Sequence, residues 1–62
     1  METFLVNDRV YLNMPQSPSH GMPGIIIRVT LFRCGSTNYY VKWDTGGEVY
    51  LPAEMLAKTS PL

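Results

Sequence analysis

The segment Gly24-Ile25-Ile26-Ile27-Arg28-Val29-Thr30-Leu31-Phe32 decides the fold, because it is the part of the chain richest in residues that favour β-strands. Its three consecutive isoleucines cannot all point to one face of a flat strand, since strand side chains alternate between faces. Two arrangements account for them. Either the strand is strongly bent or bulged and shared between two sheets, or Ile26 points outward and is buried against another subunit.

A first strand and a long loop are expected before this segment. In Asp8–Asn13, the apolar residues Val10 and Leu12 alternate with polar or aromatic residues, as in a half-buried strand. The residues of Met14–Pro23 include several Pro, Ser and Gly, which favour turns. We therefore expect this stretch to form a loop.

The residues after this segment predict two further strands joined by a tight turn. The turn residues of Arg33–Asn38 are followed by Tyr39–Asp44, which alternates as a third strand. In Asp44–Gly47, two glycines accept positive φ angles, so the chain can reverse before a fourth strand, Glu48–Leu51. The order of signals resembles a four-stranded or five-stranded barrel.

The C-terminal part of the chain is expected to close the fold. Pro52 fixes its φ angle and lacks an N–H donor, so Pro52–Leu56 is predicted as a single 3₁₀ turn, with a short last strand near Ala57–Ser60. The prediction is an all-β domain, a small barrel of five antiparallel strands with a long first loop. It spans residues 7–60, after an N-terminal extension (1–6) and before a tail (61–62).

The expected strands resemble those of the SH3-like barrel superfold, and in particular its Tudor and KOW-type domains. The resemblance is carried by Asp8-Arg9-Val10, by Gly24-Ile25-Ile26 with Val29, by Tyr40-Val41-Lys42-Trp43-Asp44 and by Leu51-Pro52-Ala53-Glu54-Met55-Leu56. In Tudor domains an aromatic cage can capture methylated lysine or arginine. Thr45 stands where such domains often carry an aromatic ring after the strand. The resemblance therefore implies the barrel and no complete cage.

A weaker resemblance is to the type II plasmid dihydrofolate reductases, which are SH3-like barrels assembled into a tetrameric pore. It is carried by Asn7-Asp8-Arg9-Val10 and the chain up to Pro52. Glu48-Val49-Tyr50-Leu51 stands where that family has Val-Gln-Ile-Tyr, so Val49 replaces the catalytic glutamine. This resemblance implies an enzyme-like oligomeric barrel without the family's catalytic motif.

Charge and reactive residues exclude several kinds of site. Five Lys and Arg balance five Asp and Glu, which disfavours a protein whose affinity comes mainly from neutralising phosphates. Cys34 and His20 are single, so we expect no intrachain disulfide, no metal site and no cofactor. Asp44 and Glu48 flank a hairpin turn, where carboxylates are usually solvated, so we expect no enzymatic activity. No signal peptide or membrane span is recognisable, and a cytoplasmic location is expected.

Surplus apolar side chains predict self-association. The interior of so small a barrel is filled by a limited set of residues: Val6, Val10, Leu12, Ile25, Ile27, Val29, Val41, Trp43, Val49, Leu51 and Leu56. Six further apolar or aromatic residues then have no interior place: Leu5, Met14, Met22, Ile26, Leu31 and Tyr40. Burial of one such side chain is worth roughly 1.5 to 3 kcal/mol. We therefore expect a homo-oligomer or an obligate complex, with the isoleucine-rich strand at the contact.

The predicted function is a small non-catalytic binding or adaptor module. Tyr11, Tyr40 and Tyr50 lie out of phase with the apolar residues of their strands, as interface aromatics do. The predicted contact residues are Tyr11, Ile26, Phe32, Arg33, Tyr40, Lys42 and Tyr50. The ligand is a protein partner or a second copy of the chain. The alternative is weak, salt-dependent nucleic-acid binding through aromatic and basic residues.

Overall fold

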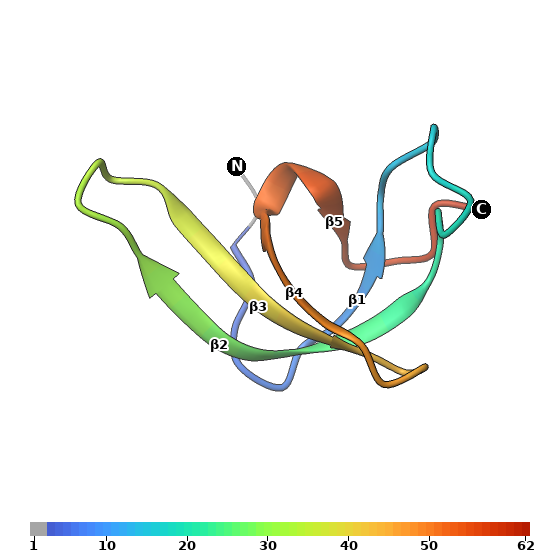
Figure 1. The fold of residues 1–62 in the computed structure, drawn as a ribbon, viewed down its shortest axis with the longest axis horizontal. Helices are drawn as coiled ribbons and strands as arrows, with labels where there is room; N and C mark the ends of the chain where they lie inside the picture. Colours follow the sequence, from blue (N-terminus) through green and yellow to red (C-terminus); the bar gives the residue numbers. More distant parts are fainter. Residues whose placement is uncertain (1–2) are drawn as a thin grey trace.

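The computed structural model describes residues 3–62, which form one antiparallel sheet (Figure 1). The elements are β1 (Arg9–Leu12), β2 (Pro23–Leu31), β3 (Thr37–Trp43), β4 (Glu48–Pro52), the 3₁₀ helix η1 (Ala53–Met55) and β5 (Leu56–Ala57). The strand order is β4-β3-β2-β1-β5. This arrangement confirms the expected all-β class, with five antiparallel strands and a 3₁₀ turn before the last. Among the described residues, no helix is long and apolar enough to cross a membrane.

A β-bulge in β2 resolves the position of the three isoleucines. Ile26 pairs with Val41 and Arg28 pairs with Tyr40, although Val41 and Tyr40 are adjacent. Ile27 is therefore the extra residue, as expected for a bulged strand. Ile26 is 0% exposed and lies in the core, whereas Ile27 is 39% exposed. The alternative of an outward Ile26, with no interior place, is wrong.

The core lies on the concave side of the curved sheet. It comprises Phe4, Val10, Ile26, Tyr39, Val41 and Leu56, with Trp43, Leu51 and Ala53 packed against it. The expectation that Val6, Ile27 and Val29 fill the interior is wrong, because all three are exposed. Ile25 is only half-buried, since it pairs with Lys42 on the opposite face from Ile26.

Two local features account for these differences. Asn7 has a φ angle of 77°, and the Asp8 N–H donates to the Leu5 carbonyl, so residues 5–8 form a turn. Val6 lies within this turn and is exposed. The β2–β3 hairpin also projects beyond the rest of the sheet (Figure 1). Val29 and Leu31 lie on this projecting part, and no core surrounds them.

The packing around Gly24 leaves no room for a side chain. A Cβ atom at this position would lie 2.6 Å from Trp43 Cε3 and 2.9 Å from Val41 Cγ1. We expect Gly24→Ala to lower the free energy of unfolding by about 1 to 3 kcal/mol, as overpacked cores do. Urea unfolding measures this. Gly47→Ala is the control, because its Cβ would meet Trp43 at an ordinary 3.7 Å, and an equal loss there would contradict the packing argument.

Candidate interaction surface

The outer face of the sheet carries a row of three side chains on three adjacent strands. Tyr40 of β3 pairs with Arg28 of β2 on one side and with Tyr50 of β4 on the other. The neighbours of Tyr40 in β3, Tyr39 and Val41, belong to the core, so strand alternation places Tyr40 on the outer face. We call Arg28, Tyr40 and Tyr50 the tyrosine row.

Each side chain of the tyrosine row contacts the next one across the strands. The Tyr40 and Tyr50 ring centroids are 4.4 Å apart, with 35° between the ring planes. The Arg28 guanidinium carbon lies 5.9 Å from the Tyr40 centroid. A cation over an exposed ring contributes about 0.5 to 1 kcal/mol, and an aromatic pair a similar amount. Tyr50 is 44% exposed, so part of the aromatic pair is open to solvent.

Glu48 fixes the orientation of the Tyr40 phenol. The Tyr40 hydroxyl donates a 2.6 Å hydrogen bond to Glu48 Oε1. This bond to the carboxylate, followed by burial and the negative charge of Glu48, raises the pKa of the Tyr40 phenol. The phenol therefore stays protonated. Tyr40 thus contacts a positive group from the row, Arg28 on β2, and a negative group from the next cross-strand row, Glu48 on β4.

The link between Tyr40 and Glu48 predicts a change in titration. The folded-state pKa of Tyr40 is raised, so the hydrogen bond from its protonated phenol to Glu48 stabilises the folded chain. This stabilisation is complete below the ordinary tyrosine pKa and is lost as pH rises through the folded-state pKa. We expect Glu48→Ala to lower the Tyr40 pKa toward that ordinary value. NMR titration of the tyrosine ring carbons measures it, with Glu54→Ala as the control. An unchanged Tyr40 pKa in Glu48→Ala would contradict the assignment.

The structure gathers some of the predicted contact residues and separates others. Lys42 is exposed on the outer face, opposite Glu48 in the cross-strand row next to the tyrosine row. Tyr11 is half-buried on β1, opposite Pro23 and Ala57 and apart from the other tyrosines. Ile26 is in the core, so its predicted place on a contact surface is wrong.

The hairpin tip holds two further predicted contact residues. Phe32 and Arg33 are both exposed and lie beyond the last ladder pair, Leu31 with Thr37. Arg28 lies beside Tyr40 but is not among the predicted contact residues. Arg28 pairs with Tyr40 because the bulge shifts the register of β2 against β3 by one residue. The sequence pattern does not reveal this shift, so it could not place Arg28 beside Tyr40.

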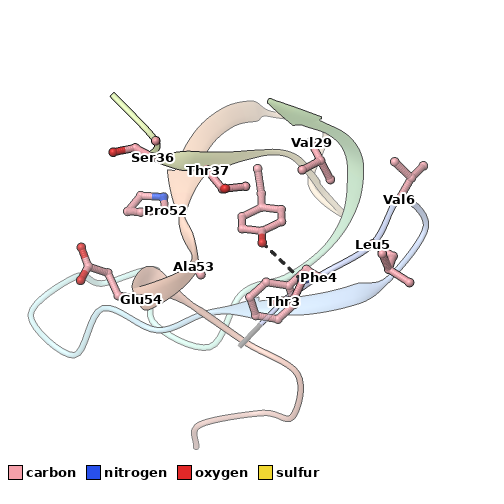
Figure 2. Close-up of a pocket in the computed structure, with 12 residues that line it drawn as sticks. Thr3, Phe4, Leu5, Val6, Val29, Ser36, Thr37, Pro52, Ala53 and Glu54 are labelled. Atoms are coloured by element: carbon pink, nitrogen blue, oxygen red, sulfur yellow. Dashed lines mark hydrogen bonds between the residues drawn. The ribbon is translucent and has the colours of Figure 1, made fainter. Parts of the chain in front are cut away.

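A groove opens on the concave side of the sheet (Figure 2). Its volume is about 740 Å³, and its lining includes Phe4, Leu5, Val6, Val29, Tyr39 and Ala53. The Tyr39 hydroxyl oxygen accepts a 3.4 Å hydrogen bond from the Phe4 N–H, and the two rings meet edge to face at 5.2 Å. Among residues 3–62, Glu54 is the only acid in the lining. The described part of the groove is therefore mainly apolar and pairs no acid with a base.

The reactive side chains outside these surfaces have local partners. The Cys34 thiol lies 3.3 Å from the Ser36 hydroxyl, and this contact lowers the pKa of the thiol. Arg9 Nη1 donates to both carboxylate oxygens of Asp44, at 2.7 and 2.9 Å. This ion pair joins β1 to the β3–β4 turn. Within residues 3–62, no three His, Cys, Asp or Glu side chains form a group that could hold a metal ion.

No protein family, curated protein or solved structure matches this chain. The resemblance to Tudor and KOW-type barrels therefore stays a prediction.

Proposed function

We propose that this chain is a small non-catalytic binding module that contacts a protein partner through the tyrosine row. The observation that carries the proposal is the Tyr40–Tyr50 ring pair on the outer face of the sheet, in which Tyr40 also contacts Arg28 and Glu48. Aromatic and arginine side chains dominate the binding energy of protein interfaces. Because these side chains already contact one another, binding costs little side-chain entropy.

The charges around the row favour a protein over a nucleic acid. Arg28 and Glu48 carry opposite charges near the same aromatic pair, and the net charge of the chain is zero. A nucleic-acid surface would combine stacking rings with an excess of positive charge. A protein partner can complement both signs with its own charged side chains.

A pair of tyrosine variants tests this function. Proteins captured from the native source by the immobilised chain are purified and titrated against the parent, Tyr50→Ala and Tyr11→Ala. We expect Tyr50→Ala to lose at least about tenfold in affinity, as a residue at an interface centre does. Tyr11→Ala is the matched control, because Tyr11 also faces outward but lies on β1, away from the row. Equal affinities for the parent and Tyr50→Ala would contradict the proposal.

Nucleic-acid binding is the second candidate function. It is favoured by Arg28 over the Tyr40 ring and by Lys42 in the adjacent row. Titration with labelled single-stranded and duplex oligonucleotides at low salt distinguishes the two candidates. Binding that weakens steeply with salt, and weakens further in Arg28→Ala, would favour the nucleic acid. Absence of binding at micromolar protein would remove this candidate.

A further inference from the structure

Within residues 3–62, the second half of β2 has a neighbouring strand on one side only. β1 pairs with β2 only from Pro23 to Ile25, and the Asn7 N–H donates to the Ile26 carbonyl. The turn at Asn7 then carries the chain away. Beyond the bulge, β3 continues to pair on one side of β2 as far as Leu31. On the other side, no strand among residues 3–62 pairs with it.

The backbone groups of this edge can be assigned from the ladder. The Phe32 N–H donates to the Ser36 carbonyl, so Phe32 and Ser36 form a hydrogen-bonded pair. Such pairs alternate along an antiparallel ladder. Thr30 and Arg28 therefore bond toward β3, while the N–H and C=O groups of Val29 and Leu31 point toward the free edge.

Apolar side chains are concentrated around this edge. Six of the eight exposed large hydrophobic side chains of the described residues lie on this part of β2, at its turn or in the N-terminal segment next to the groove: Leu5, Val6, Ile27, Val29, Leu31 and Phe32. Leu31 is 71% exposed. Val29, Leu5 and Val6 occupy the same side of the groove in Figure 2. Proteins normally protect such an edge with charges, proline or a covering segment.

We infer that this edge pairs with the same edge of a second copy of the chain, antiparallel and about a two-fold axis at Thr30. This register places Val29 of each copy opposite Leu31 of the other, which makes two equivalent pairs. Since both residues direct their backbone groups to the edge, four hydrogen bonds form between the copies. The two Thr30 residues face each other as a non-hydrogen-bonded pair, and β2 joins two sheets into one.

A second copy suits this edge for reasons of shape and charge. The edge is its own complement, because a two-fold axis brings apolar side chains against apolar side chains on the concave side. Arg28 is the only charge from Ile27 to Phe32. It lies on the outer face, and in this register it is opposite Phe32 of the other copy, so the two arginines are separated. If the register shifted by one residue in either direction, the Val29 and Leu31 backbone groups would no longer face each other, and these hydrogen bonds would be lost.

This pairing shares only Arg28 with the proposed partner surface. Tyr40 and Tyr50 lie on β3 and β4, whereas the free edge of β2 faces away from both strands. Self-association and binding of a partner can therefore be tested separately. A change at Leu31 tests the edge, and a change at Tyr50 tests the row.

Disulfide crosslinking tests the register directly. In a Cys34→Ser background, Thr30→Cys places two thiols across the axis, with Cβ atoms about 4.5 to 5.5 Å apart, close to disulfide geometry. We expect this variant to oxidise to a covalent dimer much faster than Thr45→Cys, an exposed position in the β3–β4 turn. A mixture of Arg28→Cys and Phe32→Cys should crosslink preferentially to each other, because these positions face across the axis.

Sedimentation of the unmodified chain provides the second measurement. We expect a concentration-dependent dimer, and in Leu31→Lys we expect the dissociation constant to rise at least about tenfold. Circular dichroism checks that Leu31→Lys keeps its strands, since the side chain is exposed in one copy. A parent chain that is monomeric at millimolar concentration would overturn the inference. So would a dimer that Leu31→Lys leaves unchanged, or Thr30→Cys that crosslinks no faster than Thr45→Cys.

Discussion

Replacement of Ile26 by Ala is expected to lower the free energy of unfolding by about 2 to 5 kcal/mol, the range for large core residues cut to alanine. Ile26 is completely buried, and its neighbours in the core include Val10 and Val41. A single core in a domain of this size rarely supplies more than about 3 to 5 kcal/mol of stability. We therefore expect Ile26→Ala to be largely unfolded at room temperature, as measured by circular dichroism and urea unfolding.

The neighbouring isoleucine provides a matched control for this experiment. Ile27 is the bulge residue and is 39% exposed, so its truncation leaves no enclosed cavity. We expect Ile27→Ala to change the free energy of unfolding by less than about 1 kcal/mol. Equal losses in Ile26→Ala and Ile27→Ala would show that the two side chains have similar burial in solution, and would contradict the bulged register.

The alternation of apolar residues predicted the strands, since it reports which residues share a face. Val10 and Leu12 of β1, and Tyr39 and Val41 of β3, are buried as their alternation indicates. The same reasoning could not choose a phase for three consecutive isoleucines. That choice depends on the pairing of Val10 with Gly24, which places Gly24 and Ile26 on the core side. Long-range pairing of this kind is absent from the local pattern.

The candidate surfaces were only partly accessible from the sequence. Tyr40 and Tyr50 were found by their phase, but their contact with each other and with Arg28 requires the register across three strands. The free edge of β2 was not predicted. It depends on where the chain turns at Asn7, a non-glycine residue with a positive φ angle, and on how far the β2–β3 hairpin extends beyond β1.

Phe4 shows how a residue outside the predicted barrel can belong to its core. It is 1% exposed and packs edge to face on Tyr39, while Lys58 Nζ lies 5.8 Å from its ring centroid. No strand pattern includes Phe4, because it precedes the turn at Asn7 and reaches the core through an irregular segment. Its ring closes the concave side of the sheet next to the groove.

Phe4→Ala is accordingly expected to lower the free energy of unfolding by about 3 to 5 kcal/mol, which is the usual cost of removing a buried aromatic ring. The loss combines the transfer of the ring to water with the empty space left beside Tyr39. Urea unfolding measures it, and Leu5→Ala is the matched control, because Leu5 is adjacent in sequence but 66% exposed. If Phe4→Ala and Leu5→Ala unfolded at the same urea concentration as the parent, the N-terminal segment would be a dispensable extension, and the core would be confined to the strands.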